Sequence, residues 1–309
     1  MKLRRLGTSG LKVSEVGLGC NNFGMRIDEK ATQGVVDAAL DAGITFFDTA
    51  DIYGGTKSEE FLGKALGKRR GDIVLATKFG MRIGDDESRK GGSRRWIMRA
   101  VEDSLTRLRT DWIDLYQFHQ PDPDTPIEET LRALDDLVTQ GKVRYIGNSN
   151  FTGWQIADAD WTAAGATRFV SAQNLYSLLE RKVEFEVLPA CEHFGLGFLP
   201  FFPLASGLLS GKYRRGEAAP EGSRLAAWGA RGQAAMSDRN FDKVEKLEAW
   251  AAERGHTLLE LAFAWLLGHE VVSSVIAGAT TPEQVKTNAA TAAWALTPEE
   301  VKEVGELIS

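Results

Sequence analysis

Short apolar runs recur along almost the whole chain, and amphipathic segments of helical length separate them. The runs are continuously apolar rather than alternating, as is typical of parallel strands that helices cover. Strict alternation of strand and helix around eight strands predicts an α/β fold, a (β/α)8 TIM barrel. We expect an N-terminal β-hairpin (3–6 and 13–16) before the barrel and an extra C-terminal helix after it. The expected barrel strands are 16–19, 44–48, 73–78, 113–119, 143–149, 169–174, 197–202 and 272–277.

Helical signals lie between these runs. Gly43 is a plausible C-cap for a helix over 29–40, and Pro126 stands in the first turn of a helix over 127–138. The acids Glu59 and Glu60 fall in the first turn of a helix that opens at Ser58, where the helix dipole favours them. Further helices are expected over 257–267, over 282–293 and from about Pro298. The longest irregular stretches are 82–95 and 203–240, and loops of that length are usually functional or mobile.

Composition restricts the class of protein. The 309 residues carry a net charge of −6 and no basic block, which argues against nucleic acid or an anionic membrane as a partner. Two cysteines, Cys20 and Cys191, fit a reducing compartment rather than a disulfide framework. No signal peptide or membrane span is indicated. We therefore expect a cytoplasmic protein with one domain over 1–309 and its sites at the C-terminal rim of the strands.

Four reactive side chains follow the ends of successive predicted strands. Asp48 and Tyr53 lie in the segment F-D-T-A-D-I-Y-G, Lys78 in A-T-K-F and His119 in Y-Q-F-H-Q. Each alone is common: an Asp can cap a turn, a Lys can be a solvated charge, and a lone His is more often structural. In a barrel of this type, however, functional residues gather at the C-terminal ends of the strands. The four histidines show no metal-ligand spacing, so a zinc hydrolase is not indicated.

These four residues, in this order, resemble the catalytic tetrad of the aldo-keto reductases. The resemblance implies reduction of aldehydes and ketones to alcohols, with Tyr53 as general acid and, in the reverse direction, as base. It implies that Lys78 lowers the pKa of the phenol and that Asp48 keeps Lys78 charged. His119 would donate to the substrate oxygen.

The resemblance extends over nearly the whole chain. The segments G-K-V-R-Y-I-G-N-S-N-F, A-Q-N-L-Y-S-L, P-L-A-S-G-L-L-S-G-K-Y and G-A-T-T-P-E-Q-V-K-T-N are similar, in order, to the family's cofactor-binding segments. No G-x-G-x-x-G fingerprint follows a strand, so a Rossmann site is not indicated. The resemblance implies an NAD(P)H cofactor extended across the barrel mouth. The implied contacts are Gly19, Cys20, Asn21, Ser149, Asn150, Gln173, Phe202, Leu204, Leu208, Ser210, Lys212, Gly278, Thr280, Gln284 and Asn288.

Two of these positions depart from the family pattern. Phe202 stands where relatives usually stack a Tyr under the nicotinamide, and Phe retains the stacking face. The G-A-T-T segment lacks the Lys or Arg that many relatives place against the 2′-phosphate of NADP. We expect NADPH as the cofactor because the resemblance to the family implies it, with NADH as the alternative.

Substrate and partners are less constrained. Phe23, Met25, Trp96, Trp228 and Arg231 are candidates for lining the substrate pocket, which suits a small-molecule carbonyl of medium size. The N-terminal segment also resembles the β subunits of potassium channels. A cofactor-binding regulatory subunit with little turnover is therefore the alternative function.

Overall fold

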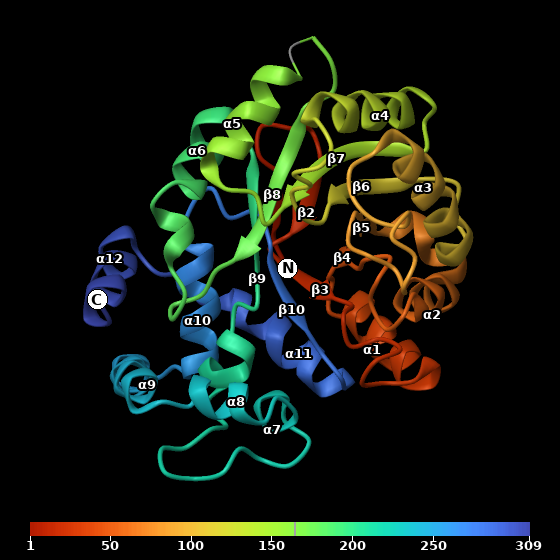
Figure 1. The fold of residues 1–309 in the computed structure, drawn as a ribbon. Helices are drawn as coiled ribbons and strands as arrows, with labels where there is room; N and C mark the ends of the chain where they lie inside the picture. Colours follow the sequence, from red (N-terminus) through yellow and green to blue (C-terminus); the bar gives the residue numbers. More distant parts are fainter. Residues whose placement is uncertain (164) are drawn as a thin grey trace.

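Eight parallel strands close into a barrel in the computed structural model, which describes residues 1–163 and 165–309. The strands follow one another around the barrel in chain order, and β10 pairs with β3 to close it (Figure 1). This confirms the predicted (β/α)8 fold. The barrel strands are β3 (Val16–Gly19), β4 (Phe46–Asp48), β5 (Val74–Phe79), β6 (Ile113–Phe118), β7 (Val143–Ser149), β8 (Phe169–Leu175), β9 (Gly197–Phe201) and β10 (Val275–Gly278).

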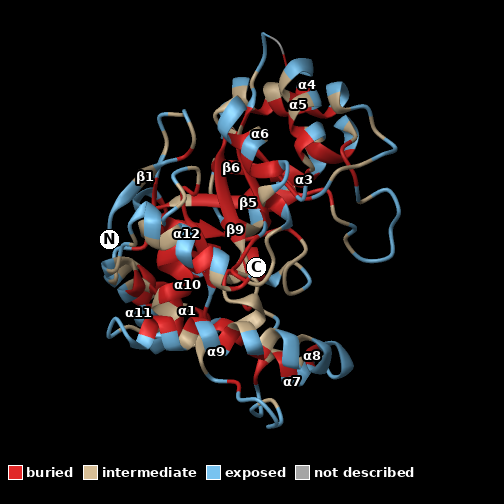
Figure 2. Cartoon of the chain, turned by 90° about the vertical axis from the view of Figure 1, so that its left-hand side faces the viewer, coloured by how far each residue is buried: buried red, intermediate tan, exposed pale blue. Residues whose placement is uncertain are grey.

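Helices cover the outside of the barrel, with apolar faces inward and polar faces toward solvent (Figure 2). In α4, buried Leu131, Leu134 and Leu137 recur at three-residue spacing, the period that places side chains on one helix face. The longer helices are α1 (Glu29–Asp41), α2 (Lys57–Leu66), α3 (Arg94–Leu108), α4 (Ile127–Thr139), α5 (Gly153–Thr162), α6 (Val187–Phe194), α9 (Asp238–Ala252), α10 (Leu258–Leu267), α11 (Pro282–Ala290) and α12 (Pro298–Leu307). Helices α3, α5, α6 and α9 were not among those predicted from the sequence.

The N-terminal hairpin, β1 (Leu3–Arg5) and β2 (Lys12–Ser14), closes the N-terminal end of the barrel. Leu6 and Val13 are fully buried and form one apolar cluster with strand residues such as Phe46 and Leu115. The amide of Thr8 donates to the carbonyl of Gly195, which fixes the hairpin turn to the end of α6. Because this end is filled with side chains, a cavity can open only at the other end.

The stretch 203–240, expected to be irregular, contains short helices. These are the 3₁₀ segment η3 (Ala205–Ser210), α7 (Arg224–Ala227) and α8 (Ala230–Ala235). Arg215 fixes the stretch to α9 through hydrogen-bonded ion pairs with Asp242 and Glu245. Within the described residues, no helix is both long enough and apolar enough to cross a membrane.

Truncation of a buried side chain in the N-terminal hairpin tests how much the hairpin contributes to stability. Leu6→Ala removes a fully buried side chain and leaves a cavity, so we expect the free energy of unfolding to fall by about 2–5 kcal/mol. Leu3→Ala, at a position 55% exposed, should change it by less than about 0.5 kcal/mol. Urea titration of both variants measures the difference. Equal effects would show that the hairpin does not form part of the barrel core.

Candidate functional site

The strand ends bring an ion pair and a phenol together at the open rim of the barrel. Lys78, on β5, directs its ammonium group to Asp48 Oδ2 at 2.6 Å and to the Thr49 carbonyl at 2.8 Å. Its third contact is the hydroxyl of Tyr53, at 3.4 Å. Lys78 is fully buried, so all three donors of the ammonium are directed to protein oxygens. Three of the four predicted side chains are therefore in direct contact.

A further pair of side chains holds the carboxylate of Asp48. Asp48 Oδ1 accepts from the amide nitrogens of Gln117 and Gln173, each at 2.9 Å. Gln117 was not predicted as a site residue, because a polar residue between apolar neighbours in the strand segment Y-Q-F-H has no distinguishing sequence signal. The Gln173 amide also donates to Gln117 Oε1. The charged pair therefore has defined hydrogen bonds on every side.

His119 completes the predicted set at the start of the loop after β6. Its ring lies edge-on to the Tyr53 ring, with centroids 5.8 Å apart. The Asn150 side chain donates to the His119 carbonyl, which connects the fourth and fifth strand ends of the barrel. All four predicted side chains thus lie in one cluster.

Burial and the ion pair determine the proton affinities in this cluster. Burial raises the pKa of the Tyr53 phenol, and the opposing Lys78 charge does not cancel the effect, so the shift is opposite to the expected lowering. Burial acts to lower the pKa of Lys78, but the Asp48 charge and the Tyr53 contact raise it overall. Burial and the Lys78 charge hold the pKa of His119 well below its usual range. At neutral pH the cluster contains a protonated phenol, an ammonium group and a neutral imidazole.

The segment that carries Tyr53 depends on glycine. Gly54 has a φ of 61°, and a Cβ there would lie 2.5 Å from the Phe23 carbonyl oxygen. Only glycine tolerates both the left-handed backbone and this close approach. The F-D-T-A-D-I-Y-G segment therefore fixes the position of Tyr53 as well as providing it.

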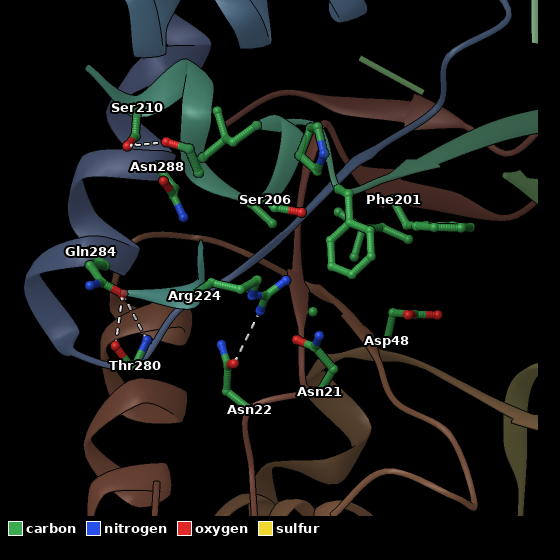
Figure 3. Close-up of a pocket in the computed structure, with 18 of the residues that line it drawn as sticks. Asn21, Asn22, Asp48, Phe201, Ser206, Ser210, Arg224, Thr280, Gln284 and Asn288 are labelled. Atoms are coloured by element: carbon green, nitrogen blue, oxygen red, sulfur yellow. Dashed lines mark hydrogen bonds between the residues drawn. The ribbon is translucent and has the colours of Figure 1, made fainter. Parts of the chain in front are cut away.

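A cavity of about 670 Å³ opens above the cluster and extends across the rim. Tyr53, His119 and Asp48 line the cavity, as do Thr280 and Gln284. Figure 3 shows Asp48 at one end of it and Thr280 and Gln284 at the other. The expected cofactor contacts that line it are Gly19, Asn21, Ser149, Asn150, Gln173, Phe202, Leu204, Ser210, Lys212, Gly278, Thr280, Gln284 and Asn288. Cys20 and Leu208 do not line it, because both side chains are buried in the apolar core.

None of the five expected substrate-pocket residues lines the cavity. Phe23 and Trp96 are buried in the core, and Met25 is exposed at the surface. Trp228 lies edge-on to Phe202 at 6.3 Å, and the guanidinium of Arg231 stacks over it at 4.6 Å. These two residues lie beside the wall of the cavity rather than on it.

Left-handed backbone shapes the wall after β9. Phe202, Ala205 and Ser206 have φ values of 52°, 45° and 62°, which non-glycine residues rarely adopt. Such conformations persist where the surrounding structure over-determines them, and they cluster at ligand sites. Leu204, Ser206 and Gly207 line the cavity as a result.

Cations line the cavity without carboxylate partners among the described residues. The guanidinium of Arg224 lies over the Phe202 ring at 5.0 Å and donates to Asn22 Oδ1 at 3.3 Å (Figure 3). Arg26 donates to the carbonyl of Gly222, and Lys212 makes no ion pair in the described chain. Arg224 was not predicted as a site residue, because it is more than fifty residues from the G-A-T-T segment in the sequence. This concentration of positive charge suits a ligand that carries phosphate groups.

Comparisons with known proteins agree with this geometry. The model of the aldo/keto reductase family matches residues 15–309. The chain belongs to the aldo/keto reductase family.

Relatives within the family fall into more than one functional class. An "Uncharacterized oxidoreductase YrpG" of Bacillus subtilis is 41% identical, over 93% of this chain and 89% of its own. A "Probable voltage-gated potassium channel subunit beta" of rice is 38% identical, over 100% of this chain and 97% of its own. A "Versiconal hemiacetal acetate reductase" of Aspergillus parasiticus is 34% identical, over 99% of this chain and 96% of its own.

The energetic role of the buried ion pair in this aldo/keto reductase fold can be measured directly. Lys78→Met leaves the Asp48 carboxylate buried and unpaired, which should lower the free energy of unfolding by about 3–5 kcal/mol. Adding Asp48→Asn should restore most of that loss. Lys64→Met, which breaks the exposed pair with Glu29, should cost less than about 1 kcal/mol. A double-mutant cycle measured by urea titration tests this. If the effects of Lys78→Met and Asp48→Asn on the free energy of unfolding simply add, the two side chains are not directly coupled.

Proposed function

We propose that this protein is an NAD(P)H-dependent oxidoreductase that reduces aldehydes or ketones to alcohols, with Tyr53 as general acid. The observation that carries the proposal is the Tyr53 hydroxyl at the cavity end, 3.4 Å from a buried Lys78 ammonium paired with Asp48. A phenol held against a fixed ammonium can release its proton to a substrate oxygen and remain as a stabilised phenolate.

The raised pKa of Tyr53 suits a proton donor. Because burial keeps the phenol protonated at neutral pH, the acid form is present before any substrate arrives. When the proton leaves, the adjacent ammonium stabilises the new negative charge. Lys78 itself stays charged because the Asp48 charge raises its pKa despite burial. In the oxidative direction the same phenolate accepts the proton.

His119 is suited to bind the substrate oxygen as a neutral donor. Its low pKa keeps the imidazole uncharged at neutral pH. Its Nδ1 atom is buried without a hydrogen-bond partner, so Nε2 is the ring nitrogen available to the cavity. With the tautomer that carries hydrogen on Nε2, His119 and Tyr53 provide two donors for one carbonyl oxygen.

The residues along the cavity fit a nicotinamide dinucleotide. Asn150 and Gln173 line the cavity close to the tetrad and offer amide oxygens for the carboxamide, and Phe202 offers the ring face that the Arg224 guanidinium does not cover. Lys212 and Ser210 would hold the pyrophosphate, and Thr280, Gln284 and Asn288 the adenosine end. When bound, this cofactor supplies the hydride that carbonyl reduction requires.

Arg224 bears on the choice between NADPH and NADH. The G-A-T-T segment carries no cation, but the folded chain places the Arg224 guanidinium on the cavity wall, free of any carboxylate in the described residues. A guanidinium binds phosphate through charge-assisted hydrogen bonds. We therefore assign Arg224 to the 2′-phosphate and favour NADPH.

A regulatory subunit is the second candidate. Its support is the similarity to proteins named as probable potassium-channel β subunits in rice and in Arabidopsis thaliana, the latter 40% identical over 93% of this chain. Binding of reduced nicotinamide with no turnover, together with stable capture of a channel protein, would favour this function.

Substitution of Tyr53 tests the catalytic proposal. Tyr53→Phe keeps the ring and removes the proton donor, so kcat for a reactive aromatic aldehyde should fall about 10²–10⁴-fold. Cofactor affinity, measured by fluorescence titration, should stay within about threefold of wild type. Undiminished turnover in purified Tyr53→Phe would exclude Tyr53 as the acid.

The assignment of Arg224 predicts a selective change in cofactor affinity. Arg224→Leu should weaken NADPH binding at least about tenfold, since a hydrogen bond between charged groups contributes about 1.5–3 kcal/mol. NADH binding should change little. Arg231→Leu is the matched control, because this exposed guanidinium stacks on Trp228 and does not line the cavity. Equal weakening of both cofactors would assign Arg224 to a group that they share.

A further inference from the structure

A second group of titratable side chains is buried on the other side of β5 from the Lys78 ammonium. Glu59, on α2, is fully buried, and its two carboxylate oxygens accept from Thr77 Oγ1 and from Arg107 Nε, each at 2.6 Å. Thr77 precedes Lys78 on the strand, so the two side chains point to opposite faces of β5. This group lies between the barrel and helices α2 and α3, outside the cavity.

Asp51 belongs to the same buried layer and has no assigned role. It is fully buried, and neither of its carboxyl oxygens has a side-chain hydrogen-bond partner. The hydroxyl of Tyr116, which lies beside Thr77 in the strand register, is also buried without a partner. Unpartnered carboxyl oxygens at such a position are costly unless the carboxyl carries a proton.

The surrounding charges favour the neutral form of Asp51. Arg107 on α3 is the cation of this layer, and Glu59 already accepts its hydrogen bond. Lys78 on β5 is paired with Asp48 on the cavity side. Burial, followed by the Glu59 charge, raises the pKa of the Asp51 carboxyl well above its usual range. The other titratable groups that face this layer are Tyr116 on β6 and Asp103 on α3.

Asp51 is covalently and spatially close to the catalytic phenol. It lies two residues before Tyr53, and its amide donates to the Lys78 carbonyl at 3.1 Å. The Tyr53 amide in turn donates to the Ala50 carbonyl at 3.2 Å. The turn that presents Tyr53 to Lys78 is therefore anchored on β5 directly at Asp51.

We propose that Asp51 is a positioning residue for Tyr53: its side chain is buried in the Glu59–Tyr116 layer as a neutral carboxylic acid, and its packing there fixes the turn that carries the phenol. The proton removes a negative charge that would be costly to bury beside the Glu59 carboxylate. Ionised Asp51 would instead set two carboxylates against one guanidinium. The effect on turnover rests on the function proposed above, whereas the protonation state does not.

The protonation state can be tested without any activity. Native Asp51 keeps its proton at pH values where the unfolded chain has lost it, so the wild type should lose stability as pH rises above about 4. Asp51→Asn cannot ionise in either state. Relative to this variant, the wild-type folding equilibrium constant should therefore fall as pH rises from 5 to 8, by up to about tenfold per pH unit for as long as native Asp51 keeps its proton.

Urea unfolding at four pH values between 5 and 8 gives the ratio of the wild-type folding equilibrium constant to that of Asp51→Asn. Asp85→Asn, at an exposed position without an ion pair in the described chain, is the matched control and should show no such trend. A ratio that is independent of pH, or one that moves in favour of the wild type as pH rises, would overturn the proposal by showing that native Asp51 is ionised.

Turnover tests the positioning role separately. Asp51→Leu, of similar size but apolar, should lower kcat at least about tenfold with KM and cofactor affinity within about threefold, because a side chain of different shape and polarity in this layer displaces the phenol. Asp51→Asn, which keeps the shape and polarity of the neutral acid, should rescue most of that loss. Equal kcat in Asp51→Leu and wild type would exclude positioning. Absence of turnover in the wild type would count against the proposed function and leave the stability result intact.

Discussion

The buried ion pair between Lys78 and Asp48 is the interaction on which the rest of the rim depends. A fully buried ammonium is tolerated only where its charge is balanced and its donors are satisfied. Asp48 at the end of β4 balances the charge, and Gln117 and Gln173 donate to its carboxylate. The Tyr53 hydroxyl is the third oxygen that the Lys78 ammonium contacts. Burial lowers the pKa of His119, and the Lys78 charge lowers it further. Burial and the charges of this pair together therefore determine the proton affinities in the cluster.

The hairpin and the strand ends divide the barrel into a closed floor and an open mouth. Leu6 and Val13 fill the N-terminal end with apolar side chains, whereas the C-terminal end carries hydrogen-bonded polar ones. The segment after β9 builds a wall across that mouth through left-handed residues, and Arg215 fixes the segment to α9. An elongated cavity with a tetrad at one end and cations along it is the result.

Sequence patterns predicted the barrel and the contact between Asp48, Tyr53 and Lys78 because strand ends of a parallel barrel must meet at one rim. They could not identify Gln117 or Arg224 as residues of the site. Gln117 is recognisable only once its neighbours across the barrel are known, and Arg224 reaches the cavity through a long segment whose path has no periodicity. The expected pocket residues Phe23 and Trp96 are core residues, because large aromatic side chains near a site pack inward as readily as they line it. The raised pKa of Tyr53 was missed because sequence gives the neighbouring charge but not the burial.

Family membership and the relatives named as oxidoreductases support an oxidoreductase, while the relatives named as probable channel β subunits make a regulatory subunit the alternative. What separates the two physically is whether a proton can be delivered at the end of the cavity. The cluster has the properties that proton delivery requires. These are a protonated phenol, the Lys78 ammonium that stabilises the phenolate left behind, and a neutral imidazole beside them. Maintaining an ammonium at full burial beside a phenol costs stability that cofactor binding alone does not require. For this reason the arrangement favours carbonyl reduction over binding without chemistry.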